Sequence, residues 1–229
     1  MNPWLFLVAA VLAIALAWWI PRFRLQRAIN APFPDEWVVL LERNIGVYLH
    51  LPMPLRMQLR RKIKQFLHEK QFSGAAGLEI TDEIRVTIAA QACMLQLNRR
   101  GALYPRLRYI IVYPSAFVVS RSELREGGVS GEARRGLAGE SWSSGKVILA
   151  WDESLHGARN FVDGRNVVLH EFTHQLDSET GSTDGAPLLA GESCYRSWAA
   201  ALSGEYRVLQ RLSLIHISEP TRPILVARM

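Results

Sequence analysis

The chain has 229 residues, of which 49% are hydrophobic and 21% charged. This composition allows one medium-sized domain with a substantial core and one additional segment, and no internal repeat or low-complexity tract indicates another architecture. The net charge of +6 is too small to indicate a nucleic-acid-binding protein, so we expect no direct nucleic-acid partner. Cys93 and Cys194 have no C-x-x-C spacing and are interpreted as buried thiols of a reducing compartment, with one disulfide as the alternative.

The first segment is an apolar stretch at the N-terminus. Residues 3–20 contain no charge, and that length is sufficient to span a membrane once as a helix. Arg22 and Arg24 follow at once, and a basic flank on this side places the rest of the chain in the cytoplasm. We therefore expect a single-pass anchor in the inner membrane at 3–20 and a linker at 21–32. A cleavable signal peptide, the alternative, would have its basic residue before the apolar stretch.

Two helices are predicted after the linker. Between residues 55 and 67, apolar residues recur every three or four positions and are separated by arginines and lysines. This basic run is interpreted as a solvated helix face, with contact to anionic lipid beside the anchor as the alternative. The second helix is predicted to begin after Thr81, a good N-cap followed by two acids, and its apolar residues through Leu95 are predicted to lie in the core.

Two strands are predicted next. Residues 108–113 and 146–151 are rich in β-branched and aromatic side chains, and Pro114 ends the first run. The residues between them include 123–144, which are rich in Gly, Ser and charge and are predicted to form a loop or an irregular hairpin. The second strand shortly precedes the helix described next, so we expect it to pair with an extended peptide substrate.

His170, Glu171 and His174 form the pattern H-E-x-x-H, which follows an apolar run at 166–169. Residues four apart lie on the same face of a helix, so the two imidazoles can bind one metal ion. Burying these three polar groups without partners would cost free energy, and a metal would satisfy them. The pattern predicts a Zn2+ site with His170 and His174 as ligands and Glu171 as the general base that takes a proton from the bound water.

Several segments together resemble the zinc-dependent peptidases related to Mlc titration factor A. The resemblance is strongest at residues 166–177, around the two histidines, and at 184–187. It also covers, in the same order along the chain, residues 72–74, 77–83, 88–93, 109–117 and 145–151. These segments extend over most of residues 33–210, which is far more specific than H-E-x-x-H alone.

The resemblance implies an α/β (α+β) zincin-like metallopeptidase domain at 33–211, similar to the catalytic domain of anthrax lethal factor. It implies aminopeptidase-like hydrolysis of peptide substrates with Zn2+ as the cofactor. For some members it also implies a link to a transcriptional repressor of sugar-uptake genes. Two alternatives stay open: a membrane-tethered repressor-binding protein whose peptidase activity is incidental, and an inactive fragment.

A catalytic zinc site needs a third protein ligand. The resemblance places it in a glutamate of a C-terminal motif that would fall beyond residue 229, and the chain contains no such motif. Glu192 is the alternative within the chain, because its distance from His174 matches that in other sites with two histidines and a glutamate. Asp177, on the same helix face as His174, is predicted to orient a ligand by hydrogen bonding rather than to bind the metal itself.

The last residues of the chain, from 212 onward, lie outside the segments that resemble the family. From Leu212 the chain reads Leu-Ser-Leu-Ile-His-Ile-Ser-Glu-Pro-Thr-Arg, which resembles the translation of a transposase adapter used in sequencing libraries. We therefore expect residues 212–229 to be foreign to the natural protein and exclude His216 as a ligand. The natural frame would continue after Arg211 and supply the third ligand.

Overall fold

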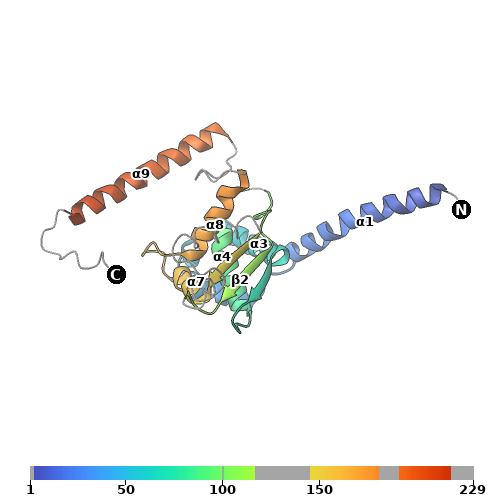
Figure 1. Ribbon diagram of the computed structural model, residues 1–229, viewed down its shortest axis with the longest axis horizontal. Helices are drawn as coiled ribbons and strands as arrows, with labels where there is room; N and C mark the ends of the chain where they lie inside the picture. Colours follow the sequence, from blue (N-terminus) through green and yellow to red (C-terminus); the bar gives the residue numbers. More distant parts are fainter. Residues whose placement is uncertain (1–2, 100, 117–144, 181–190, 218–229) are drawn as a thin grey trace, which may run out of the picture. The chain divides into compact units, whose positions relative to one another are not determined.

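The computed structural model describes residues 3–99, 101–116, 145–180 and 191–217, so the loop or hairpin predicted at 123–144 lies outside the described residues. The chain divides into two compact units, Met1–Ala186 and Pro187–Met229. The first unit is mainly helical with a small sheet (Figure 1). Its elements are, in chain order, α1 (Pro3–Asn30), α2 (Asp35–Asn44), the 3₁₀ helix η1 (Tyr48–His50), α3 (Met53–Glu69), β1 (Gln71–Gly74), α4 (Asp82–Met94), β2 (Tyr109–Tyr113), β3 (Lys146–Ala150), α7 (Trp151–Arg159), α8 (Val167–Asp177) and the 3₁₀ helix η2 (Ser178–Thr180). The second unit contains α9 (Glu192–Ile217).

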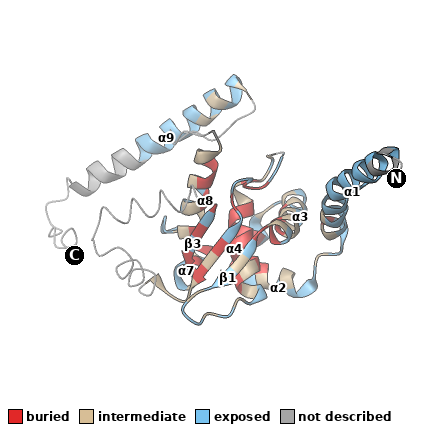
Figure 2. Ribbon diagram, turned by 45° about the vertical axis from the view of Figure 1, so that its right-hand side comes forward, coloured by how far each residue is buried: buried red, intermediate tan, exposed pale blue. Residues whose placement is uncertain are grey.

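The sheet consists of three parallel strands in the order β1-β2-β3. Alternate side chains of a strand point to opposite faces, and here Ile110 and Val112 of β2 share a buried face with Val147 and Leu149 of β3. α7 and α8 both contact β3. The result is a helix-dominated α/β arrangement in which one face of a small parallel sheet lies in the core (Figure 2).

The central helix of the first unit is α4. Thr81 is its N-cap, as predicted, since its hydroxyl accepts a hydrogen bond of 3.4 Å from the backbone N–H of Ile84. All residues at 86–93 are buried, because α2, α3, α7 and α8 all contact this helix. A helix surrounded in this way can be apolar on every side. The predicted core role of this segment is therefore confirmed.

The other predicted elements are present with small shifts at their ends. The helix predicted at 55–67 is the middle of α3, and β2 begins one residue after the predicted start. The second predicted strand ends at Ala150, because Trp151 already begins α7, whose first turn holds Asp152 and Glu153. Acids favour the first turn of a helix because its N–H groups are unsatisfied.

α1 continues well beyond the predicted anchor. The segment 21–32, predicted to be a linker, is helical as far as Asn30, and the helix passes through Pro21. The stretch Leu7–Asn30 is long and apolar enough to cross a membrane, with a mean hydropathy of 1.6 in its most apolar part, and that part is not buried in the protein. Arg22 lies with its guanidinium 3.6 Å from the ring centre of Trp18, at the change from apolar to basic sequence.

The two cysteines differ in exposure. Cys93 lies buried in α4, whereas Cys194 is exposed on α9, and both are free thiols. The prediction of a buried thiol is confirmed for Cys93 and wrong for Cys194. Burial raises the pKa of the Cys93 thiol well above its usual range.

Candidate metal centre

The helix that carries the two histidines starts at a fixed point. Asn166 is its N-cap, with Oδ1 accepting a hydrogen bond of 2.8 Å from the backbone N–H of Leu169. The Nδ2 of the same side chain donates to Gln91 Oε1 of α4 and to the carbonyl of Gly157 in α7, both at 2.8 Å. Gln91 is itself held, since its Nε2 donates to the carbonyl of Ser154 at 3.1 Å. The side-chain amide of Asn166 therefore caps α8 and links it by hydrogen bonds to α4 and α7.

Gly157 allows α7 to approach the start of α8 closely. A Cβ at this position would lie 2.9 Å from the Cα of Asn166 and 3.1 Å from the carbonyl oxygen of Arg165. Both contacts are with backbone, which cannot give way as the end of a side chain can. The close contact of the two helices therefore requires glycine here.

The rotation of α8 about its axis is fixed by the residues it buries. Phe172 is fully buried, and its ring centre lies 4.8 Å from that of Tyr104 and 5.7 Å from that of Phe66. Tyr104 is anchored in turn, since its hydroxyl donates to the carbonyl of Ala92 at 2.7 Å. With this face in the core, the opposite face of α8 points outward.

That outward face holds the predicted ligands. The Nε2 atoms of His170 and His174 lie 3.2 Å apart, and the two rings are nearly perpendicular, with an angle of 87° between their planes. Two imidazole nitrogens bound at 2.0–2.1 Å to a tetrahedral zinc would be about 3.3 Å apart. His170 is exposed and His174 is half-buried, so solvent reaches the pair. The two side chains thus fit a shared metal ion in both spacing and chemistry.

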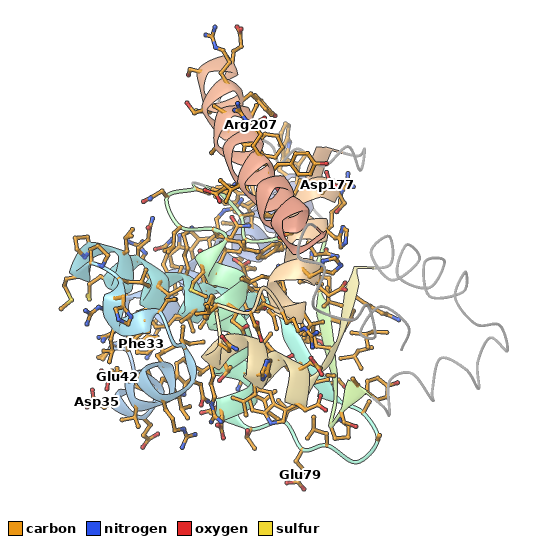
Figure 3. All side chains as sticks on the ribbon, turned by 90° about the vertical axis from the view of Figure 1, so that its left-hand side faces the viewer. Phe33, Asp35, Glu42, Glu79, Asp177 and Arg207 are labelled. Atoms are coloured by element: carbon orange, nitrogen blue, oxygen red, sulfur yellow. The ribbon has the colours of Figure 1, made fainter. Side chains whose placement is uncertain are left out.

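The remaining predicted residues do not complete the site within the described residues. Glu171 is half-buried beside His170, and Asp177, labelled in Figure 3, is the half-buried last residue of α8. Glu192 is the first residue of α9 in the second unit, where its exposed carboxylate lies 3.8 Å from Arg196. Among the residues that the structure describes, no three His, Cys, Asp or Glu side chains gather closely enough to hold a metal. The third ligand stays a prediction.

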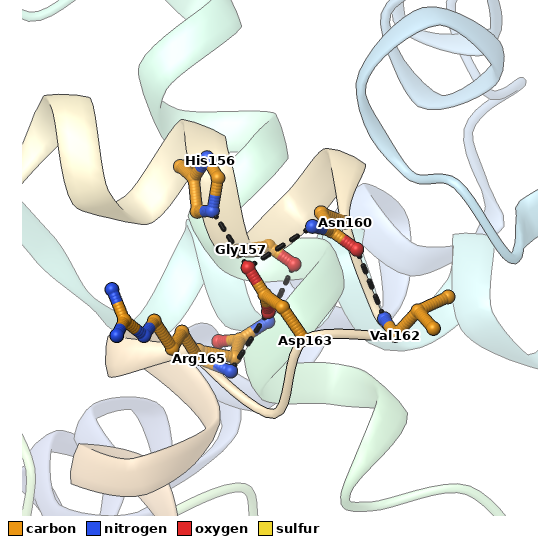
Figure 4. Close-up of polar contacts among 7 residues, drawn as sticks. His156, Gly157, Asn160, Val162, Asp163 and Arg165 are labelled. Carbon is orange, nitrogen blue, oxygen red and sulfur yellow. Dashed lines mark hydrogen bonds and ion pairs between the residues drawn. The ribbon is translucent and has the colours of Figure 1, made fainter. Parts of the chain in front are cut away.

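A hollow of about 310 Å³ lies beside His170, between the loop at 160–166 and the first turns of α8. Asp163 shapes this loop (Figure 4). Its carboxylate lies 2.8 Å from the Nε2 of His156 and accepts hydrogen bonds from the Asn160 side chain at 3.0 Å and from the backbone N–H of Arg165 at 2.9 Å. The bond from Arg165, and then that from His156, hold the pKa of Asp163 below its ordinary value of 3.8.

Sequence reasoning missed these supporting residues as parts of the site. The signal for Gln91 is an amide in a segment that is otherwise apolar and predicted to be buried, since buried amides need partners. Asp163 follows Asn160 and precedes Gly164, a composition typical of a structured turn. Neither pattern reveals which distant groups these side chains contact.

The chain is similar in sequence to several known proteins. The family model described as glucose-regulated metallo-peptidase M90 matches residues 19–218. The uncharacterized protein slr2042 of Synechocystis is 38% identical over 212 residues, which cover 91% of this chain and 76% of that protein. Mlc titration factor A of Klebsiella pneumoniae is 29% identical over 162 residues, and that of Yersinia pestis is 25% identical over 148 residues.

The matches to Mlc titration factor A cover 70% and 64% of this chain, and the chain spans 58% and 54% of the length of those two relatives. The family match, by contrast, extends over most of the chain, from the second half of α1 to the end of α9. It includes both histidines and the helices that position them. The chain therefore belongs to the glucose-regulated metallo-peptidase family M90.

Proposed function

We propose that the protein is a zinc-dependent peptidase with an aminopeptidase-like action, in which His170 and His174 provide two of three metal ligands. The observation that carries the proposal is the 3.2 Å separation of their Nε2 atoms on an outward helix face. Membership of a metallopeptidase family supports the presence of a metal. Zinc is the metal we expect, since imidazoles together with a carboxylate form the usual catalytic zinc site.

The side chains of the protein would then have separate roles in the reaction. Zinc, when bound, supplies a Lewis acid and lowers the pKa of a water molecule to about 7. Glu171, beside the first ligand, would accept the proton from that water and return it to the leaving amine. The cap at Asn166 and the buried ring of Phe172 would hold both imidazoles in place, so that little reorganisation is needed when substrate binds.

The third ligand would be a glutamate outside the chain as given, and Glu192 is the alternative within it. This proposal depends on residues 212–229 being foreign to the natural protein, so the family match, which runs to residue 218, would include seven foreign residues at its end. Sequencing the gene again tests it, because the frame should continue differently after Arg211. The same last residues in an independent read would refute the proposal and leave Glu192 as the ligand to test.

The wider setting follows from α1 and from the relatives. We expect the zincin-like fold of lethal-factor-type peptidases, with α1 anchoring the protein in the inner membrane and the catalytic unit in the cytoplasm. The stretch Leu7–Asn30 supports the anchor, and the basic residues that follow its uncharged part, Arg22, Arg24 and Arg27, support the orientation. Peptides are the expected substrates.

Metal content and hydrolysis, measured together, test the proposed function. The protein extended along its natural frame should contain stoichiometric zinc and hydrolyse aminoacyl or short peptide substrates, whereas the chain ending at Met229 should bind zinc weakly, because two ligands hold it less tightly than three. His170→Ala should remove the metal from the extended protein. His68→Ala, which removes an exposed histidine of α3, is the matched control and should keep it. Stoichiometric zinc in the His170→Ala protein would refute the assignment.

A second candidate function is capture of a transcriptional repressor, with hydrolysis incidental. The name of the relatives, Mlc titration factor A, favours it. Repressor pull-down with the extended protein separates the two functions: capture that survives His170→Ala would be independent of the metal. Capture lost together with the metal would tie both to the same site.

A further inference from the structure

Two hollows lie where α1 ends against α3, far along the chain from the histidines. The larger one, of about 640 Å³, lies between the residues at 29–33 and one face of α3. The second, of about 470 Å³, is lined by α1 residues from Phe23 to Asn30 and by Ala31. Asn30 and Ala31 line both hollows, so the two are adjacent.

The lining combines basic and apolar residues. Arg60, Arg61 and Lys64 line the larger hollow and Arg27 lines the second, while no acidic residue lines either. Apolar walls come from Phe33, Met57 and Phe23, of which Met57 and Phe23 are 56% and 52% exposed. Such a site favours a molecule with a negatively charged group and an apolar part.

The side chain of Arg60 is held in place by two aromatic residues. Its Nε donates to the hydroxyl of Tyr48 at 2.7 Å, and its guanidinium carbon lies 5.6 Å from the ring centre of Phe33, which is labelled in Figure 3. Within the described part of the chain, the two terminal nitrogens of Arg60 make no hydrogen bond, and the side chain of Arg61 makes neither a hydrogen bond nor an ion pair. Both guanidinium groups therefore retain donors for a ligand.

Lys64 shows that positive charge is crowded here. Its ammonium donates to the carbonyl of Ala31, which joins α3 to the end of α1. Partial burial, and then the neighbouring charge of Arg61, lower the pKa of Lys64. A bound anion would offset both costs.

The position along α1 matches the surface of a bilayer. Arg27 and Asn30 follow the last residue of the uncharged stretch, Ile20, by about 10 Å and 15 Å along the helix axis. The headgroup layer on each side of a bilayer is about 5–8 Å thick. The second hollow therefore borders the headgroups, and the larger one begins just beyond them, within reach of the long side chains of Arg60 and Arg61.

We propose that these two hollows form a binding site for the phosphate headgroup of an anionic phospholipid, whose acyl chains lie along the exposed apolar surface of α1. The site would fix the protein's depth and orientation on the membrane by a lipid-specific contact in addition to the apolar helix. The inference rests on the proposed anchoring by α1 and is independent of the peptidase chemistry. Alkaline extraction of cell membranes tests the anchoring separately. If the anchoring is wrong, the extraction releases the protein; if only the lipid site is wrong, the protein stays in the membrane.

The test uses the full chain in a neutral detergent with short-chain lipids. Binding of phosphatidylglycerol and of phosphatidylcholine is measured by native mass spectrometry or by fluorescence of a labelled lipid. Phosphatidylglycerol should bind more tightly, and Arg61→Gln combined with Lys64→Gln should weaken its binding roughly 30-fold, because each cation near a lipid surface contributes about one factor of five to six. Phosphatidylcholine binding should change little in the double variant.

Two control proteins accompany this experiment. Arg85→Gln with Arg108→Gln removes the same charge from a half-buried and an exposed position outside the hollows and should bind phosphatidylglycerol as the wild type does. Arg61→Lys with Lys64→Arg keeps the charge and should also retain binding, which separates the ionic contact from a packing effect. Equal binding of the two lipids, or an unchanged double variant, would overturn the proposal. Displacement of the lipid by millimolar inorganic phosphate would also overturn it, since the site would then serve a soluble anion.

Discussion

Asn166 and Gln91, which lie 75 positions apart in the sequence, are joined by a hydrogen bond of 2.8 Å between the side-chain nitrogen of the first and the side-chain oxygen of the second. The same Asn166 side chain caps the helix that carries His170 and His174. The two roles can be separated by mutation, because the side-chain oxygen of Asn166 caps α8, whereas its side-chain nitrogen makes the hydrogen bonds to Gln91 and Gly157, called the tether below. The geometry of the histidine pair therefore depends on a contact with the central helix.

Asn166→Asp keeps the cap oxygen but replaces the donor with a second oxygen, which faces the acceptors of Gln91 and Gly157. We expect the free energy of unfolding to fall by about 1–3 kcal/mol, although an acid alone would favour this end of a helix. Thr81→Ala, which removes a cap without a tether, should cost about 1 kcal/mol and serves as the comparison. Urea unfolding followed by circular dichroism measures both. An Asn166→Asp protein as stable as wild type would show that the tether is unimportant.

Glu171→Gln tests the proposed general base. The amide is nearly isosteric with the carboxylate but cannot accept the proton, so kcat for peptide hydrolysis by the extended protein should fall by about 10²–10⁴-fold. Zinc content should stay unchanged, because Glu171 is not a predicted ligand. Turnover is measured with a chromogenic peptide and metal by mass spectrometry. Retained turnover would refute the role of Glu171.

Phe172 is the largest side chain that α8 places in the core. Phe172→Ala should lower the free energy of unfolding by about 3–5 kcal/mol, since it leaves a cavity between Tyr104 and Phe66. Phe23→Ala, on the exposed surface of α1, should change it by less than about 0.5 kcal/mol in detergent. Chemical unfolding followed by tryptophan fluorescence makes the comparison. Equal stability of the two variants would contradict the packing described for α8.

The loop beside His170 should weaken in acid. A carboxyl whose pKa is lowered on folding stabilises the protein above its ordinary pKa, and that contribution disappears as the pH falls through the lowered value. For Asp163 the loss of this stabilisation therefore begins near pH 3.8 and is complete below the pKa of the folded protein. Wild type should melt at a higher temperature than Asp163→Asn at neutral pH, and the difference should vanish at the acid end of this window. Asp35→Asn is the control for acid effects unrelated to the loop.

The two thiols should react at very different rates. In the folded protein, an aromatic disulfide reagent should modify the exposed Cys194, whereas Cys93 is buried and holds its proton because burial raises its pKa. In a Cys194→Ser variant, no thiol should react until denaturant is added. Rapid modification of that variant under native conditions would show that α4 is not the closed core described.

Local sequence predicts much of the fold. The features that it does not predict depend mainly on contacts between residues far apart in the chain. Periodicity and the Thr81 cap predict α3 and α4, and β-branched residues predict β2 and β3. β1 was missed because it is only four residues long, ends in Gly74 and has a single half-buried side chain, Phe72. α7 was missed because Trp151 continues the apolar run of β3. The parallel pairing of the strands has no local signal.

The candidate metal site, like the fold, can be predicted only in part from local sequence. Spacing alone predicts that His170 and His174 lie on one helix face, and the structure brings their nitrogens to 3.2 Å. Which way that face points depends on Phe172, Tyr104 and Phe66, which come from three separate segments. A pattern of five residues cannot contain that information.

Gly157 has a consequence for how this site can change. Because backbone meets backbone there, the starting point of α8 cannot be adjusted by exchanging one side chain for another of different size. Every replacement at this position adds atoms, so each one must push the ligand-bearing helix away from α7. Attempts to retune the centre by laboratory evolution should therefore find accepted changes on the outward face of α8 and in the loop at 160–166, while position 157 stays invariant among the active clones.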